Sequence, residues 1–199
     1  MKAINKQRRA ALPPQPELLA PKPELLAPAG DLEKLRFAYA YGADAAYIGA
    51  GPYSLRQSSG LKSEQMAEAI ALARAAGKKL YVALNAYLRN QELAALPLYV
   101  SRLAALEPHG LIISDPSLIK LARDYAPNLP LHLSTQVNTT NWQAAEFWRG
   151  QGLSRVNLAR ELSLAEAAEI ARCSRIEAEV FIHGAMCISY SGRCLLSNF

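Results

Sequence analysis

The sequence predicts an α/β protein built as a (β/α)8 TIM-type barrel, of which about seven βα units are present. Short apolar runs alternate with helical patterns, and several runs are continuously apolar, as in strands covered on both faces. The runs recur at roughly 25 residues, the spacing of a βα unit. A doubly wound sheet is the alternative, but its Gly-rich phosphate-binding motif is absent.

Seven segments are expected to form the strands: 24–27, 45–49, 80–85, 111–114, 131–135, 155–159 and 177–183. Helix signals lie between them. Asp31 is expected to cap the first helix, and Asp115 followed by Pro116 has the pattern of an N-cap and first helical residue. Ser163 and Glu166 form a capping-box pattern. A barrel that ends at its seventh strand leaves two open sheet edges, so we expect an N-terminal part of a longer protein.

Two regions differ in composition. Residues 1–22 are basic and rich in proline, and we expect a flexible leader there. Residues 23–199 are expected to be the N-terminal part of the barrel domain, truncated after the first cysteine motif. Most of the net charge of +5 comes from Lys2, Lys6, Arg8 and Arg9 in the leader. The body is therefore close to neutral, which weakens a nucleic-acid prediction based on charge, although a flexible tail can touch phosphates.

The sequence has no segment that suits a membrane or export. No stretch approaches the roughly 18 apolar residues that cross a bilayer, and the basic start lacks the apolar core of a secretory signal. We expect a cytoplasmic protein with no membrane partner. Three cysteines, an odd number, without an export signal argue against a disulfide framework.

In a TIM-type barrel, active-site residues lie at the carboxyl ends of strands and in the loops that follow. Polar residues at these positions are Tyr53, Ser54, Arg56, Asn85, Ser114, Asp115, Ser134, Gln136, Asn138, Arg160, Glu161, His183, Cys187 and Cys194. The candidates for catalytic groups are Arg56, Asn85, Gln136, Arg160 and His183. Arg56 stands out because a guanidinium binds carboxylate or phosphate through two hydrogen bonds.

Several of these side chains have structural alternatives. Asp115 is better explained as a helix cap. Glu161 is expected to pair with Arg160 or to sit in solvent, and Asn138 or Thr139 to cap the helix that follows. These alternatives leave the role of each single residue open.

The histidines give no clear catalytic pattern. His183 is expected to end a buried strand and face the site, His109 to lie in a loop and His132 to lie in the core. His183 precedes Cys187 by four residues, but catalytic Cys–His pairs usually meet through the fold rather than the sequence. The hydrolase motifs G-x-S-x-G and H-E-x-x-H are absent.

The cysteines divide into two groups. Cys187 and Cys194 are expected in the loop after the seventh strand, close to Gly184 and Gly192, which let the backbone approach a cofactor. Cys173 is expected on the opposite face, as a small buried apolar residue. Two thiolates do not complete a zinc or iron–sulfur site, which normally takes four ligands. The spacing alone is compatible with half a metal site, a redox pair or coincidence.

The chain resembles the collagenase-like peptidase family U32 over residues 23–199. The resemblance is strongest in "EVFIHGAMCISYSGRCLLSNF" and extends through "ELLAPAGDLEKLRFAYAYGADAAYIG", "YSLR", "GKKLYVALN", "LIISDPSLIKLA", "HLSTQVNTTN" and "ARELSLAE". Within the family, "AYGADAAYIGAGPYSLR" and "HGAMCISYSGRCLLS" are most similar to the prephenate-dependent tRNA uridine hydroxylation branch.

The resemblance implies two kinds of activity. Some members are described as proteases that degrade collagen, and others as hydroxylation proteins that work without molecular oxygen on tRNA, on rRNA or in ubiquinone biosynthesis. In the hydroxylation branches four cysteines hold a [4Fe–4S] cluster, and the first two match Cys187 and Cys194. The other two would lie beyond Phe199, so we do not expect this chain alone to assemble the cluster.

The favoured hypothesis is an iron–sulfur protein for oxygen-independent hydroxylation of a tRNA wobble uridine, with prephenate as the oxygen donor and tRNA as the partner. One alternative is a collagenase-like peptidase with a protein or peptide substrate. A second is a hydroxylation protein that acts on rRNA or a quinone precursor. A third is a non-catalytic fragment that folds poorly or pairs through its open edges.

Overall fold

The computed structural model describes residues 22–54, 61, 63–184 and 188–194. Seven parallel strands form one sheet in chain order. They are β1 (Leu26–Pro28), β2 (Ala45–Gly49), β3 (Lys79–Leu84), β4 (Gly110–Ile113), β5 (Leu131–Leu133), β6 (Arg155–Asn157) and β7 (Glu177–Glu179). The expected incomplete TIM-type barrel is confirmed. The predicted leader lies outside the described residues, except for Lys22.

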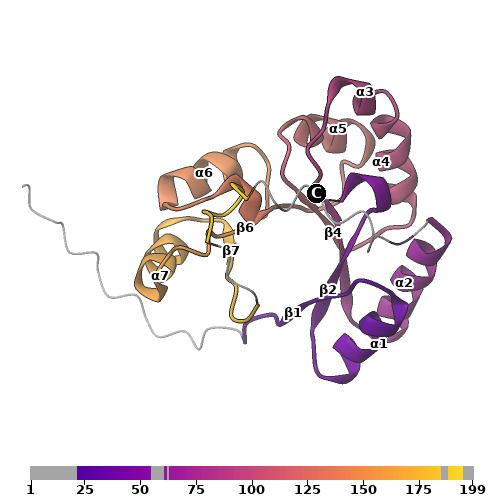
Figure 1. Ribbon diagram of the computed structural model, residues 1–199, viewed down its shortest axis with the longest axis horizontal. Coiled ribbons are helices and arrows are strands. Elements are labelled where there is room, and N and C mark those ends of the chain that lie inside the picture. The colour runs from indigo at the N-terminus through magenta and orange to yellow at the C-terminus, as the bar shows by residue number, and fades with distance from the viewer. Residues whose placement is uncertain (1–21, 55–60, 62, 185–187, 195–199) are drawn as a thin grey trace, which may run out of the picture.

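Helices connect the strands and cover the outer side of the curled sheet (Figure 1). They are α1 (Leu32–Ala40), α2 (Ser63–Ala75), α3 (Asn90–Leu93), α4 (Leu96–Ala105), α5 (Ser117–Tyr125), α6 (Trp142–Gly150) and α7 (Leu164–Cys173), with 3-10 turns η1 (Gly51–Tyr53) and η3 (Thr135–Val137). Two helices, α3 and α4, join β3 to β4. In the described part of the chain, no helix has the length and apolar character needed to cross a bilayer.

The two faces of the sheet bury different residues because side chains alternate along a strand. The outward face is aliphatic and packs under the helices: Ile48, Leu80, Val82, Leu84, Leu111, Ile113, Leu133 and Val156 are fully or almost fully buried. Each such side chain stabilises the fold by about 1.5–3 kcal/mol. A second cluster on the inner face comprises Ala45, Tyr81, Ala83 and Ile112. The first four strands therefore line the barrel interior mainly with apolar groups.

The inner face becomes polar from β5 onward. Arg155 on β6 pairs in register with His132 on β5 and with Glu177 on β7, so the three side chains share this face. Arg155 is only 5% exposed and His132 is similarly buried. This half of the barrel interior thus holds ionisable groups that require partners.

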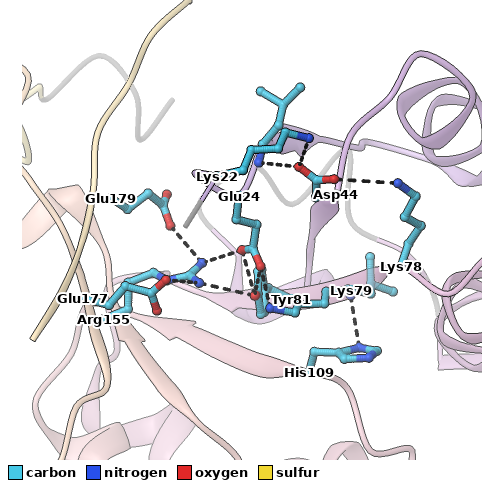
Figure 2. Close-up of polar contacts among 12 residues, drawn as sticks. Lys22, Glu24, Asp44, Lys78, Lys79, Tyr81, His109, Arg155, Glu177 and Glu179 are labelled. Atoms are coloured by element: carbon cyan, nitrogen blue, oxygen red, sulfur yellow. Dashed lines mark hydrogen bonds and ion pairs between the residues drawn. The ribbon is translucent and has the colours of Figure 1, made fainter. Parts of the chain in front are cut away.

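Arg155 finds those partners at the amino end of the barrel (Figure 2). Its Nη1 lies 3.0 Å from Glu24 Oε1, its Nη2 lies 2.9 Å from Glu177 Oε1, and Glu179 Oε2 lies 3.6 Å from Nη1. The guanidinium also sits 5.1 Å from the centre of the Tyr81 ring. We call these five residues the Arg155 cluster.

The carboxylates of the Arg155 cluster differ in proton affinity. Burial acts to raise the pKa of Glu24, but hydrogen bonds from Lys79 and Tyr81 and the charge of Arg155 outweigh burial and lower it. Burial raises the pKa of Glu179, and Arg155 offsets only part of that effect. Burial also lowers the pKa of His132 to about 3, and the nearby positive charge of Arg155 adds to this effect.

The helix caps agree in part with the sequence patterns. Asp31 accepts a hydrogen bond from Lys34 N at 2.8 Å, and Ser163 and Glu166 form the predicted capping box. Asn141 caps α6, so the expectation for Asn138 or Thr139 was wrong. Asn138 instead ends η3 in a left-handed conformation, and that places it in a turn before the helix.

The start of α5 also differs by one residue from the prediction. Pro116 is the N-cap and the helix begins at Ser117, rather than at Pro116. Asp115 Oδ1 still accepts a hydrogen bond from Ser117 N at 2.8 Å. The structural explanation for Asp115 as a capping group is therefore confirmed, although its position in the cap is shifted.

The later strands are shorter than predicted. β7 ends at Glu179, whereas the apolar pattern extended the strand to His183. In the described residues β7 pairs with β6, which is itself three residues long, so the following apolar residues have no ladder to join. Val180, Phe181 and Ile182 are exposed as a result.

Candidate functional site

Loops that follow β3, β5, β6 and β7 meet around a small cavity of about 80 Å³ at the carboxyl end of the barrel. We call it the carboxyl-end cavity, and its lining residues are Tyr87, Thr135, Gln136, Arg160, Tyr190, Gly192 and Cys194. Three predicted site residues, Gln136, Arg160 and Cys194, are thus brought together. This is the end of a TIM-type barrel at which active sites form.

Gln136 contributes a hydrogen-bond donor to this region. The residue lies in η3, whose N-cap Ser134 accepts from Gln136 N. The Ser134 hydroxyl donates in turn to Gln136 Oε1 at 3.2 Å, and this fixes the amide orientation. Gln136 Nε2 is buried without a hydrogen-bond partner in the described part of the chain. A buried donor of this kind is suited to bind an acceptor group of a ligand.

Arg160 links the loop after β6 to the segment after β7. Its guanidinium carbon lies 5.4 Å from the centre of the Phe181 ring, within the range of a cation–π contact. Its backbone N–H donates to Ser191 Oγ at 3.2 Å. The residue therefore contacts both the start and the end of the described segment that follows β7.

Glu161 is exposed, as one of the alternatives predicted, but its carboxylate is engaged. It accepts hydrogen bonds from Ser191 N at 2.5 Å, Ser191 Oγ at 2.9 Å and Asn138 Nδ2 at 3.1 Å. Desolvation acts to raise the pKa of Glu161, but the hydrogen bonds from Ser191 and Asn138 outweigh it and lower the pKa. Sequence reasoning missed this contact and missed Ser191.

Gly192 and Tyr87 complete the contact between the segment and the barrel. Gly192 has φ +78°, and a Cβ there would lie 1.9 Å from Gln136 O, so only glycine fits. Tyr87 Oη donates to Gly192 O at 3.3 Å. The sequence had marked Gly192 as a site of close approach, whereas Tyr87 carried no signal beyond its position after a strand.

Other predicted residues lie near the carboxyl end without lining this cavity. Ser54 is buried, and its hydroxyl lies 3.4 Å from Asn85 Oδ1. The Tyr53 ring packs edge-on against Tyr99 at 4.7 Å, which is a packing role. Ser114 is half-buried directly after β4. Asn85 does not line the carboxyl-end cavity, and its predicted role stays a prediction.

The histidines do not gather at the candidate site. His183 is exposed and lies beyond β7, so the expectation that it ends a buried strand was wrong. His109 lies in a loop, as predicted, and its Nδ1 accepts from Leu80 N at 3.1 Å (Figure 2). His132 is buried in β5, also as predicted. None of the three histidines lines the carboxyl-end cavity in the described structure.

Arg56 and Cys187 lie outside the described residues, so their predicted roles stay predictions. Cys173 ends α7, which returns the chain to the amino end of the barrel, and it is half-buried rather than buried. Of the two cysteines that the structure describes, only Cys194 lines the carboxyl-end cavity.

The donor set fits an iron–sulfur cluster only in part. Such a cluster takes four thiolates, and the described residues place one thiol, Cys194, at the cavity. Across the described residues, no group of three or more His, Cys, Asp and Glu side chains is arranged to hold a metal ion. We therefore assign no reaction step to a cluster.

A larger hollow of about 320 Å³ lies at the amino end, lined by Lys22, Pro23, Glu24, Asp44, Gly77, Lys78 and Lys79. Its charges already have partners (Figure 2). Lys79 Nζ lies 2.7 Å from Glu24, and Lys22 and Lys78 lie 3.4 and 3.9 Å from Asp44. The smaller cavity at the carboxyl end is the better candidate because it combines a thiol, a guanidinium and an unused donor.

These features define a TIM-type βα barrel whose candidate site lies under a thiol-bearing loop at the carboxyl end. The chain belongs to peptidase family U32, because the model of that family matches residues 30–199. The resemblance found in the sequence is thereby confirmed.

Curated relatives include hydroxylation proteins. The chain is 47% identical to tRNA hydroxylation protein P1 of Bacillus subtilis, over 92% of the chain and 42% of that protein. It is 47% identical to tRNA hydroxylation protein P of Escherichia coli, over 93% of the chain and 40% of that protein. It is 34% identical to the E. coli 23S rRNA 5-hydroxycytidine C2501 synthase, over 85% of the chain and 26% of that protein. The chain thus spans less than half the length of these relatives.

Solved structures agree on the fold. The U32 peptidase Mk0906 superposes with a TM-score of 0.66 at 15% identity, over 79% of this chain and 67% of that one. Tryptophan synthase TrpA from M. tuberculosis superposes with a TM-score of 0.54 at 14% identity, over 78% of this chain and 72% of that one. At such low identity the likeness concerns the barrel architecture alone.

Proposed function

We propose that the protein to which this chain belongs hydroxylates a wobble uridine of tRNA without molecular oxygen, in the cytoplasm. The observation that carries the proposal is 47% identity to two tRNA hydroxylation proteins over more than nine-tenths of the chain. The relative named as an rRNA 5-hydroxycytidine synthase supports RNA hydroxylation more broadly. In this proposal the chain supplies seven strands of the barrel and the carboxyl-end cavity.

The same proposal gives roles to individual residues. Cys187 and Cys194 supply two of the four thiolates of a [4Fe–4S] cluster, which would provide electron transfer beside the substrate. Arg160 and Gln136 bind the substrate or the oxygen donor, for which prephenate is our candidate. A guanidinium and an amide N–H are suited to a carboxylate ligand, since both donate hydrogen bonds to oxygen.

A gene-replacement experiment tests the function. We would delete the gene in its host, grow the strain without oxygen, and measure hydroxyuridine in hydrolysed tRNA by mass spectrometry. The modification is expected to disappear and to return with the wild-type gene, but not with Cys194→Ala. Cys173→Ala is the matched control, because Cys173 ends α7 away from the cavity, and it should restore the modification. Unchanged tRNA in the deletion strain would overturn the proposal.

A peptidase function has less support from the site. A cysteine or serine nucleophile needs a nearby base, and the three histidines lie away from the cavity in the described structure. Cleavage of collagen by the purified protein, abolished by Cys194→Ala and retained in Cys173→Ala, would favour peptidase activity over our proposal.

A further inference from the structure

The described segment 188–194 has one buried residue, Ser191. Ser191 is 1% exposed, whereas Tyr190 beside it is 68% exposed and Ile188 is fully exposed. Apolar burial therefore contributes little to holding this segment in place. The polar contacts of Ser191 and the close fit of Gly192 are among the contacts that hold it in place.

The N–H and the hydroxyl of Ser191 both contact the loop after β6. Its N–H and its hydroxyl both donate to the carboxylate of Glu161, and its hydroxyl oxygen accepts from Arg160 N. Because these groups are buried, loss of the acceptor would leave donors unsatisfied, which is more costly than loss of an exposed hydrogen bond. Glu161 is thus the acceptor on which the position of Ser191 depends.

Glu161 is itself held in place from the other side. Asn138 adopts a left-handed conformation with φ 56° at the end of η3, and its amide donates to Glu161 Oε1 at 3.1 Å. One Glu161 carboxylate therefore links the loop after β5 to the segment after β7. Both of its oxygens accept hydrogen bonds from protein groups, so a role in binding substrate is not favoured.

Gly192 lies between Ser191 and Cys194, and its close packing links the position of Ser191 to that of the Cys194 thiol. The backbone of Gly192 lies directly against Gln136 O, and Tyr87 Oη donates to Gly192 O. Cys194 follows two residues later and lines the carboxyl-end cavity with Arg160 and Gln136. A shift of Ser191 would therefore move Cys194 relative to both groups.

We propose that Glu161 is a positioning residue, which fixes the Cys194 thiol at the carboxyl-end cavity by holding Ser191. The inference rests on the proposed function for the role of Cys194 in hydroxylation. Its test measures the position of the thiol, which does not depend on hydroxylation.

The test uses the reactivity of Cys194 in the 199-residue chain. Cys173→Ser and Cys187→Ser leave Cys194 as the single thiol, and iodoacetamide is a neutral reagent whose approach is insensitive to a change of charge. Glu161→Ala and Ser191→Ala are expected to raise the alkylation rate at saturating pH about tenfold, corresponding to about 1.4 kcal/mol. Glu161→Gln should recover part of the protection, because its amide oxygen still accepts from Ser191 N–H.

Two controls separate positioning from other effects. Glu169→Gln removes a carboxylate from an exposed position of α7 and should leave the rate unchanged. Unfolding in urea, followed by circular dichroism, should show that each variant is folded. The full pH profile distinguishes exposure of the thiol from a change in its pKa. The proposal is overturned if only the midpoint of the pH profile moves and the rate at saturating pH does not. It is also overturned if Glu161→Ala, Ser191→Ala and Glu161→Gln all react within about twofold of the parent, a difference of roughly 0.4 kcal/mol.

A second measurement separates this inference from the proposed function. Genes encoding Glu161→Ala and Cys194→Ala would be returned to the deletion strain and tRNA hydroxyuridine measured. If alkylation rises in Glu161→Ala while tRNA is unchanged in the deletion strain, the positioning role stands and the proposed function fails. If Cys194→Ala abolishes hydroxylation while alkylation is unchanged in Glu161→Ala, the function stands and the positioning role fails.

Discussion

The two ends of the barrel use polar groups in different ways. At the amino end, Arg155 and its carboxylates lie on the strands or next to them, and the guanidinium is buried among its partners. At the carboxyl end, polar groups come from loops, and Gln136 Nε2 lacks a partner in the described structure. The same sheet thus supports a buried network of paired charges at one end, although Arg155 Nε has no partner in the described structure, and polar groups carried by loops at the other end. The carboxyl end is where active sites form in this architecture.

The strongest test of this comparison is Arg155→Met. Removal of the guanidinium leaves Glu24, Glu177 and Glu179 without their shared positive partner, and loss of one member of a buried ion pair typically costs about 3–5 kcal/mol. Arg36→Met is the control, since its pair with Glu68 is exposed on both sides and should contribute less than about 1 kcal/mol. Urea unfolding measures both variants, and a loss below about 1 kcal/mol in Arg155→Met would contradict a structural role for the amino end.

A smaller effect is expected from the pH dependence of His132. Its folded-state pKa of about 3 lies below its ordinary value of 6.5, because burial and the nearby Arg155 disfavour the charged imidazole. Only the unfolded chain takes up a proton as the pH falls below that ordinary value. The free energy of unfolding is therefore highest, as far as His132 is concerned, above pH 6.5. It declines by up to about 1.4 kcal/mol per pH unit as the pH falls below that value.

His132→Gln provides the comparison for this pH dependence. The variant does not titrate at this position, so its unfolding free energy between pH 7 and 5 should fall less steeply than that of the wild-type chain. Urea unfolding at several pH values measures both slopes. Equal pH dependence of the unfolding free energy in the wild-type chain and in His132→Gln would contradict the lowered pKa of His132. It would show that this part of the barrel interior is more hydrated than the burial of His132 indicates.

Gly192→Ala and Gly77→Ala compare the two ends through the same substitution. Both glycines have positive φ, but a Cβ at Gly77 meets nothing within 4 Å, whereas one at Gly192 would collide with Gln136 O. Gly77→Ala should lower global stability by about 1 kcal/mol, because a residue with a Cβ is disfavoured in the left-handed region. Gly192→Ala should release the 188–194 segment and speed hydrogen exchange at Ser191 N–H, with a smaller change in global stability. The opposite pattern would mean that the segment belongs to the cooperative core.

The smallest effect is expected from Glu179→Gln. Burial raises the folded-state pKa of Glu179, so the folded chain holds this proton more tightly than the unfolded chain does. The resulting contribution to the free energy of unfolding is present below the unfolded pKa and is lost as the pH rises through the folded pKa. The Gln carbonyl can keep the hydrogen bond that Asn157 Nδ2 donates to Glu179 Oε1 at 2.7 Å.

At pH 7 we therefore expect Glu179→Gln to be neutral or stabilising by less than about 1 kcal/mol, and relatively less favourable in acid. Glu177→Gln removes a charged partner 2.9 Å from Arg155 and should destabilise the chain instead. Equal losses in the two variants, measured by urea unfolding, would contradict the distinction between these carboxylates.

The fold was largely predictable because apolar periodicity and capping patterns are local. β2 lies where the sequence placed it, at 45–49, and the capping box of α7 forms as expected. The later strands were less predictable because their inner face is polar: Arg155 in β6 donates to Glu24, which is 131 residues away in the chain. No local pattern reports such a partner.

The candidate site was predicted in part for the same reason. Gln136, Arg160 and Cys194 follow from the rule that barrel sites form after the strands. The contacts of Ser191 with Glu161 and of Gly192 with Tyr87 join segments 30 and 105 residues apart. These contacts depend on how two loops meet, so single-sequence reasoning did not find them.

The ion pair between Glu24 and Arg155 also has a consequence for synthesis of the chain. Glu24 leaves the ribosome 131 residues before Arg155, which at typical rates of translation is a delay of roughly 10 s. During that interval Lys79 and Tyr81 emerge first, and both contact Glu24 in the finished barrel. Both residues can contact the Glu24 carboxylate before Arg155 is synthesised. Strands β1, β2 and β3 can therefore associate before the ion pair between Glu24 and Arg155 forms.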